Sequence, residues 1–179
     1  MKILIIAGSP RAGKDTFCEA AFYGRGLVYP ISTIDRIKQI ALFAGWSGEK
    51  DAKGRKLLSD IKDALTLYND LPRNYVLDYI RTKTEQLDDT IMLGSDEAIF
   101  LVQSREPTDI KRWQEENGAR ALHISREGVE QHWGNHADDE VDLYIFDYYL
   151  ENNGTLLEWE EKAVEFIDKI RKERWQSRV

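Results

Sequence analysis

A glycine-bounded loop near the start of the chain carries residues that could bind phosphate. Residues 8–16 read Gly-Ser-Pro-Arg-Ala-Gly-Lys-Asp-Thr, and an apolar run over residues 3–7 precedes them. Gly8 and Gly13 can adopt backbone angles that other residues avoid, so the loop can curl with successive N–H groups facing an anion. Lys14 adds a mobile positive charge, and the helix expected after it adds the positive end of its dipole. This spacing predicts a phosphate-binding P-loop between a strand and a helix.

The residue after the lysine departs from the general G-x-x-x-x-G-K-[ST] pattern. Asp15 takes the place of the hydroxyl residue, which comes one position later as Thr16. Adenylate kinase loops are similar in this respect, so the departure indicates a small-molecule kinase rather than a motor or a GTPase. Asp15 and Thr16 are both candidate magnesium ligands, and the sequence leaves open which of them binds the ion. The residues expected to contact the nucleotide phosphates are Gly8, Ser9, Arg11, Ala12, Gly13, Lys14, Asp15 and Thr16.

Size and composition indicate one globular domain over residues 1–179. The chain is 42% hydrophobic and 32% charged, and none of its apolar runs approaches the ~20 residues that a membrane span needs. The first apolar run leads directly into the loop, so it is typical of a strand and not of a signal peptide. The single cysteine, Cys18, cannot form an internal disulfide and is expected to pack in the core. We expect a cytoplasmic protein with no membrane partner.

The net charge excludes a general nucleic-acid surface. The formal charge is -7, whereas long polyanions are bound by dense lysine and arginine patches. A small anion needs only a local cluster of positive charge. The expected partners are therefore small-molecule nucleotides, and the chain is expected to be a monomer or a homodimer.

Apolar runs alternate with segments of helical spacing along the whole chain. This alternation predicts an α/β fold of three layers, with a mostly parallel five-stranded sheet covered by helices on both sides. Ligands then bind at the carboxyl ends of the strands. Residues 46–89, between the second and third strands, are numerous enough to form a helical lobe over the sheet edge. The expected strands are residues 2–7, 27–31, 98–103, 120–124 and 148–151, and the expected helices are residues 14–22, 32–46, 55–86 with a break at 69–72, 107–117, and from Thr155 onward.

Several segments, taken in order, resemble phage-type deoxynucleoside monophosphate kinases. They are also similar to animal phosphomevalonate kinases, which share this branch of the P-loop kinases. The resemblance implies a P-loop NTPase fold that uses ATP and Mg²⁺, a helical acceptor-binding lobe, and a short lid at about residues 126–140. The segments that carry the resemblance are residues 8–16, 32–38, 55–58, 105–110, 117–119, 124–126 and 150–155.

The resemblance implies a role in transfer for three basic residues. Lys14, Arg105 and Arg126 would spread the negative charge of the moving phosphoryl group, which arginine does with a planar fork of donors. Arg105 follows the third expected strand, and Arg126 stands where the lid begins. The alternatives are an ion pair of Arg105 with Asp109 and an ordinary loop charge for Arg126.

The resemblance also implies contacts with the acceptor and with the donor base. The acceptor contacts would be Asp35, Lys38, Arg55, Arg105 and Asp109. Asp35 and Lys38 could instead form an i,i+3 pair, and Arg55 could simply solvate its helix. Asn153 and Gly154 follow the fifth strand, where related kinases close over the donor base with backbone groups. A turn before a capped helix explains these two residues as well.

One position differs from the family in a way that affects chemistry. Family members have an aspartate two residues before the arginine that follows the third strand, and this chain has Gln103 there. A carboxylate at this place would hold magnesium or accept a proton, whereas an amide carries no charge. Asp15 could take over part of that role. Three functions therefore stay open: a nucleoside monophosphate kinase, a kinase of a non-nucleotide phosphate such as phosphomevalonate, and a nucleotide-binding protein with weak or lost catalysis.

Overall fold

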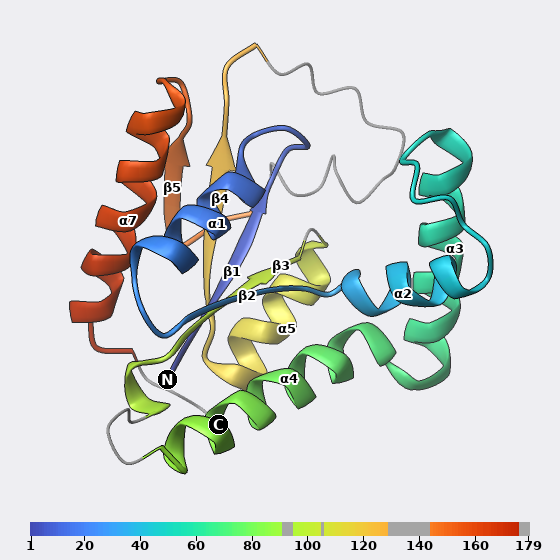
Figure 1. The fold of residues 1–179 in the computed structure, drawn as a ribbon, viewed down its shortest axis with the longest axis horizontal. Helices are drawn as coiled ribbons and strands as arrows, with labels where there is room; N and C mark the ends of the chain where they lie inside the picture. Colours follow the sequence, from blue (N-terminus) through green and yellow to red (C-terminus); the bar gives the residue numbers. More distant parts are fainter. Residues whose placement is uncertain (91–94, 105, 129–143, 176–179) are drawn as a thin grey trace.

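The strands form one sheet in which all neighbours run parallel. The computed structural model describes residues 1–90, 95–104, 106–128 and 144–175 (Figure 1). The strand order in the sheet is β2-β3-β1-β4-β5, and each pairing is parallel. The five expected strands are confirmed to within one residue at each end. The strands are β1 (Lys2–Gly8), β2 (Val28–Ser32), β3 (Ile99–Gln103), β4 (Arg120–Ser125) and β5 (Tyr148–Glu151).

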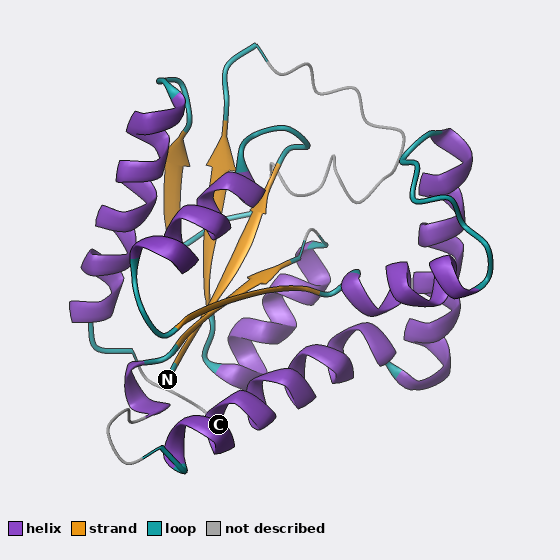
Figure 2. Cartoon of the chain, viewed as in Figure 1, coloured by secondary structure: helices purple, strands orange, loops and turns teal. Residues whose placement is uncertain are grey.

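Helices connect these strands and cover the sheet (Figure 2). The fold is α/β with helices on both faces of a parallel sheet, as the sequence predicts. None of the described helices is long and apolar enough to cross a membrane. The helices are α1 (Lys14–Gly24), α2 (Asp35–Phe43), α3 (Ala52–Asn69), α4 (Leu71–Asp88), α5 (Pro107–Asn117) and α7 (Leu156–Lys172), with a short 3-10 turn η1 (Ser95–Glu97).

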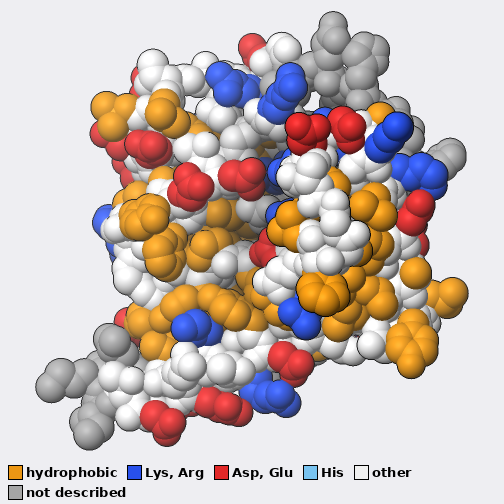
Figure 3. Space-filling model, turned by 45° about the vertical axis from the view of Figure 1, so that its right-hand side comes forward, with side chains coloured by type: hydrophobic (Ala, Val, Ile, Leu, Met, Phe, Trp, Pro, Cys, Tyr) orange, Lys and Arg blue, Asp and Glu red, His pale blue; other side chains and the backbone are white. Residues whose placement is uncertain are grey.

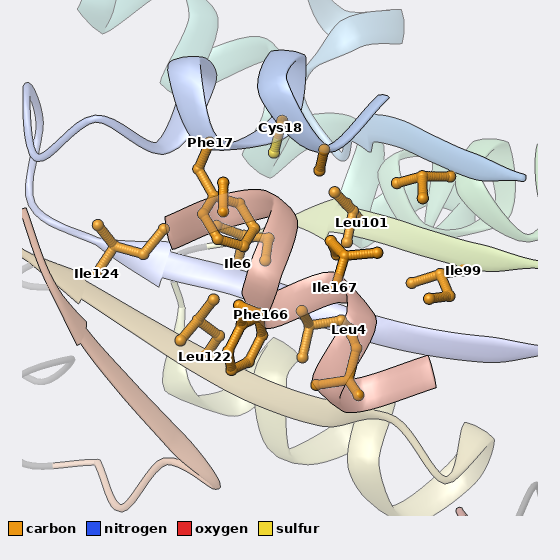
Figure 4. Close-up of a cluster of buried hydrophobic side chains, with 14 of the residues drawn as sticks. Leu4, Ile6, Phe17, Cys18, Ile99, Leu101, Leu122, Ile124, Phe166 and Ile167 are labelled. Atoms are coloured by element: carbon orange, nitrogen blue, oxygen red, sulfur yellow. The ribbon is translucent and has the colours of Figure 1, made fainter. Parts of the chain in front are cut away.

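Each face of the sheet has its own hydrophobic core, because side chains alternate between the two faces along a strand. Ile3 and Ile5 of β1 pack with α4 and α5 on one face. Leu4 and Ile6 of the same strand pack with α1 and α7 on the other face, which Figure 4 shows around Phe17 and Phe166. These strands are buried on both faces, as is typical of parallel sheets. Because β1 is packed in both cores, it fixes where the loop that follows it begins.

Helix α2 begins later than the sequence predicts. The sequence predicts Ser32 or Thr33 as the N-cap residue, but the helix starts at Asp35 with Ile34 at the N-cap and no side-chain cap. Instead, the Asp35 carboxylate accepts a hydrogen bond from the backbone N–H of Ser32 over 2.8 Å. Ser32 is the last residue of β2. Ser32 therefore belongs to β2 and does not act as the N-cap of α2.

For α7 the sequence predicts a capping box at residues 155–158 and a core position for Leu156; the capping box is confirmed and the core position is wrong. The Thr155 hydroxyl accepts a hydrogen bond from the Glu158 N–H, and the Glu158 carboxylate accepts one from the Thr155 N–H. Leu156 is 64% exposed and does not pack on the sheet. Trp159, one turn farther on, is 2% exposed and starts the buried stripe in its place. Trp159 also contacts the loop between β1 and α1 through a hydrogen bond to Gly13.

Only part of residues 46–89 projects beyond the sheet. Helices α2 and α3 lie past the β2 edge in Figure 1, where they share a small core around Ile37, Ala41 and Leu58. In contrast, α4 returns under the sheet and contributes Val76 and Ile80 to the core below it. The projecting lobe is therefore α2 with α3, and α4 belongs to the sheet layers.

Candidate phosphate-binding site

The segments that carry most of the predicted site residues begin at one edge of the sheet. Because the strands are parallel, their carboxyl ends meet at the same edge, where ligands bind in open α/β sheets. Five segments lie at this edge: the loop after β1, the junction of β2 with α2, the end of β3, and the turns after β4 and β5. Figure 3 shows a face that is hollowed near its centre, with basic and acidic side chains around the hollow.

The loop itself has the backbone that a phosphate site requires. Gly8, Arg11 and Gly13 take positive φ angles of 130°, 65° and 97°. At Gly8, a Cβ would lie 2.0 Å from the backbone oxygen of Ile124 in β4. The loop leaves β1 close against the neighbouring strand, so only glycine fits there.

Lys14 lies folded over the inside of the loop. Its Nζ donates hydrogen bonds to the carbonyl oxygens of Gly8 and Ser9 over 2.7 and 2.6 Å. Lys14 is 8% exposed. Its ammonium group is therefore largely removed from water and needs hydrogen-bond partners within the protein. An anionic ligand above the loop could replace the carbonyl oxygens as partners of the ammonium group.

Two side chains that sequence reasoning missed support the loop from behind. Asn152 Nδ2 donates to the carbonyl oxygen of Ala12 over 2.9 Å. Trp159 Nε1 donates to the carbonyl oxygen of Gly13 over 3.0 Å. Both residues are buried. A tryptophan at a buried helix position was the available signal, since its ring N–H needs a partner there.

Gln103 and Asp15 are direct neighbours. Gln103 Nε2 donates to the Asp15 carboxylate over 3.0 Å and lies 3.6 Å from the Cys18 sulfur. Asp15 is in the first turn of α1, and Gln103 ends β3. Gln103 stands where the kinases that the sequence resembles have a carboxylate, and its amide orients the Asp15 carboxylate instead.

Asp15 and Thr16 suit magnesium chemically. Mg²⁺ prefers oxygen ligands, and it usually keeps several waters while it binds one or two protein groups and substrate phosphates. Asp15 is exposed in the first turn of α1 and Thr16 is next to it. Within the described ranges, no group of three or more His, Cys, Asp or Glu could hold a metal ion by itself. The residues thus fit an ion bound largely by phosphate oxygens and water.

Burial controls the reactivity of Cys18. Loss of hydration in the core raises the pKa of its thiol to about 12, an increase that the hydrogen bond from Gln103 partly opposes. Because the thiolate is the reactive form, we expect iodoacetamide to leave Cys18 unmodified at pH 8 in the folded protein. In urea the thiol should react fully, because exposure returns the pKa to its ordinary range. Mass spectrometry of both samples would measure this, and rapid modification of the native protein would contradict the buried site.

No protein-family model matches this sequence, and no curated protein does. Among solved structures, a dephospho-CoA kinase from Campylobacter jejuni is 16% identical with a TM-score of 0.50, covering 96% of this chain and 98% of that one. A protein from Chloroflexus aurantiacus assigned to the kinases is 15% identical with a TM-score of 0.50, covering 94% of each chain. The chain has the fold of a P-loop kinase. At these identities the likeness shows the fold and nothing finer.

Asp35 and Lys38, two of the predicted acceptor contacts, form an ion pair with each other. Lys38 Nζ donates to Asp35 Oδ1 over 3.0 Å, and Asp35 Oδ2 accepts from the backbone of Ser32. The i,i+3 pair that the sequence left open is thus present, and both carboxylate oxygens of Asp35 are used locally. Arg55 is exposed in the first turns of α3, in the projecting lobe. Asp35 and Lys38 therefore pair at the start of α2, whereas Arg55 lies on the neighbouring helix α3.

An ion-pair cluster ties the projecting lobe to the start of α5. Lys62 of α3 bonds the Glu106 carboxylate and lies 3.9 Å from that of Asp109. Burial raises the pKa of Asp109, and the charge of Lys62 opposes this shift. Sequence reasoning missed Lys62, because nothing in the spacing of α3 shows which face meets α5. Arg105, for which an ion pair with Asp109 is the alternative to a role in transfer, lies outside the described residues.

Of the predicted lid at residues 126–140, the structure describes only the first residues, 126–128. Arg126 is exposed directly after β4, and residues 129–140 of the predicted lid lie outside the described part. The backbone N–H of Glu127 donates to the Asn153 side chain over 2.9 Å. The turn with Asn153 and Gly154 therefore lies against the beginning of the lid, at the same edge as the phosphate-binding loop.

Proposed function

We propose that this chain is an ATP- and magnesium-dependent kinase of a nucleoside or deoxynucleoside monophosphate. An oxygen of the acceptor's phosphate would attack the γ-phosphorus of ATP, and the bond from that phosphorus to the β–γ bridging oxygen would break. The products are a nucleoside diphosphate and ADP. The observation that carries this proposal is the loop between β1 and α1, with Lys14 folded over it at 2.7 and 2.6 Å from two carbonyl oxygens.

The residues that the sequence predicts for the site would divide the work of transfer between them. The loop and Lys14 bind the donor phosphates, and Asn153 and Gly154 contact the donor base. Arg105 and Arg126 add positive charge around the transferred group, which is what phosphoryl transfer needs most. Mg²⁺, when bound through Asp15 or Thr16 and the phosphates, would neutralise charge between the β and γ oxygens. The lobe of α2 and α3, with Asp35, Lys38 and Arg55, would receive the acceptor together with Asp109 of α5.

Residues 1–179 would then form one kinase domain, with the acceptor lobe formed by α2 and α3 and the lid at 126–140. Closure of lobe and lid would exclude water, so that ATP is not hydrolysed. The ion pairs of Lys62 with Glu106 and Asp109 cross the boundary between lobe and sheet layers. These ion pairs would break or form if the lobe moved relative to the sheet layers.

The test is a coupled assay of ADP formation with ATP, Mg²⁺ and each common ribo- or deoxyribonucleoside monophosphate in turn. We expect turnover with at least one of them and a low rate without acceptor. Phosphomevalonate is included as a non-nucleotide acceptor. Turnover of phosphomevalonate alone would assign the chain to that second class, and turnover of none would overturn the proposal.

Gln103 favours a second candidate, a nucleotide-binding protein with weak catalysis. If the missing carboxylate limits transfer, Gln103→Asp should raise kcat by about tenfold at saturating Mg²⁺, since a carboxylate can order the metal's water or accept a proton. Gln103→Asn, which keeps the amide and shortens it equally, is the matched control and should give no gain. Steady-state kinetics of both variants measures this. If Gln103→Asp is no faster than Gln103→Asn, catalysis is not limited by the lost carboxylate.

A further inference from the structure

Two side chains from the end of β5 and the start of α7 hold the phosphate-binding loop by its carbonyl groups. Asn152 Nδ2 lies 2.9 Å from the oxygen of Ala12, and Trp159 Nε1 lies 3.0 Å from the oxygen of Gly13. Asn152 is 5% exposed and Trp159 is 2% exposed. Buried hydrogen bonds of this kind fix the groups that they join, because neither partner can turn to water.

The orientation of these carbonyl groups also fixes two N–H groups. A peptide unit is planar and trans, so its C=O and N–H point in opposite directions. The carbonyl of Ala12 shares a peptide with the N–H of Gly13, and the carbonyl of Gly13 shares one with the N–H of Lys14. The Gly13 oxygen also accepts a backbone hydrogen bond from the Phe17 N–H over 2.9 Å, and Trp159 is its second donor. With the two carbonyl oxygens held by these donors, the N–H groups of Gly13 and Lys14 point the opposite way. N–H groups at such a loop-to-helix junction are the ones that bind phosphate.

The glycine at position 13 belongs to the same arrangement. A Cβ on Gly13 would lie 2.3 Å from Asn152 Nδ2 and 2.9 Å from Trp159 Nε1. The two donors therefore occupy the space that a side chain would fill. This steric observation is independent of the hydrogen bonds and points to the same two residues.

We propose that Asn152 and Trp159 are positioning residues that aim the N–H groups of Gly13 and Lys14 at the nucleotide phosphates. The inference rests on the proposed function, because it assumes that the loop binds phosphate. Asn152 also precedes Asn153 and Gly154, the expected contacts of the donor base. The end of β5 would thus connect base binding with the shape of the phosphate site.

The test uses inorganic tripolyphosphate, which has no base or sugar, as the probe of the loop. Trp159→Phe removes the ring N–H and keeps most of the packing, and Asn152→Ala removes the other donor. Trp113→Phe is the matched control, because Trp113 is equally buried at 1% exposure but belongs to the core on the opposite face of the sheet. Lys14→Ala is the positive control. Circular dichroism sets a temperature at which every variant is folded.

We expect each positioning variant to raise the Kd for tripolyphosphate by about tenfold, the worth of one hydrogen bond that orients the site. In ¹H–¹⁵N spectra of the ligand-free protein, the amide signals of Gly13 and Lys14 should shift in both variants. Trp113→Phe should leave the Kd and these two signals unchanged.

Three results would overturn the inference. If the positioning variants bind like the wild type while Lys14→Ala does not, the inference fails and the proposed function stands. If Trp113→Phe weakens binding as much as Trp159→Phe does, the effect comes from general packing and the inference fails. If the wild type binds neither tripolyphosphate nor ATP, the inference and the proposed function fail together.

Discussion

Lys14→Ala lowers the rate of phosphoryl transfer by about a thousandfold, which is the size expected for loss of a charged donor aimed at the transition state. Lys14 is the buried ammonium group of the loop, 8% exposed. With nucleotide bound, it would exchange the carbonyl oxygens of Gly8 and Ser9 for phosphate oxygens. Alanine leaves those phosphate charges without a mobile partner. The measurement is kcat and KM in the coupled assay.

A matched lysine elsewhere separates this effect from a general change in charge. Lys56 of α3 pairs with Asp60 on the surface, where its side chain is 76% exposed. Lys56→Ala removes the same charge and should change the rate by less than about twofold, since exposed pairs contribute little. Equal rates for Lys14→Ala and the wild type would contradict the assignment of the loop.

Gly8→Ala lowers the free energy of unfolding by about 3 kcal/mol or more, because it combines an unfavourable backbone angle with a steric overlap. The φ angle of Gly8 is 130°, and the new Cβ would lie 2.0 Å from the Ile124 backbone oxygen. That oxygen belongs to β4 and cannot move without disturbing the sheet. Urea unfolding measures the change in the free energy of unfolding, and the slope m is compared between the variant and the wild type.

Gly26→Ala is the control for this change. Nothing lies within 4 Å of a Cβ built at Gly26, which has no positive φ angle. Its substitution should change the free energy of unfolding by about 0.5 kcal/mol or less. If Gly8→Ala is tolerated as well as Gly26→Ala, the close contact between the loop and β4 does not exist in solution.

The strands of the sheet are predicted well because each depends on a pattern within a few neighbouring residues. Each strand is a short apolar run next to a turn or a helix start, and five such runs suffice to give every strand to within one residue. The capping box at Thr155 is equally local. The start of α2 is predicted less well, because Asp35 turns its carboxylate back to the N–H of Ser32 and so competes with the expected cap.

The site is predicted in its loop and only partly in its surroundings. Residues 8–16 carry their own geometry, since the glycines and Lys14 act within one short segment. Asn152, Trp159 and Lys62 reach the site from distant segments, and their roles depend on which face of a strand or helix meets the edge. Gln103 shows the same limit: its spacing reveals a missing carboxylate but not that its amide orients Asp15. Contacts between distant segments require the three-dimensional structure.

The most direct measurement is a crystal structure of the full chain with Mg²⁺ and a non-hydrolysable ATP analogue. We expect the β-phosphate on the N–H groups of Gly13 and Lys14, with Lys14 Nζ moved from the oxygens of Gly8 and Ser9 to the β- and γ-phosphates. An analogue bound elsewhere, with Lys14 still bonded to those two carbonyl oxygens, would contradict the proposal that this loop binds the triphosphate.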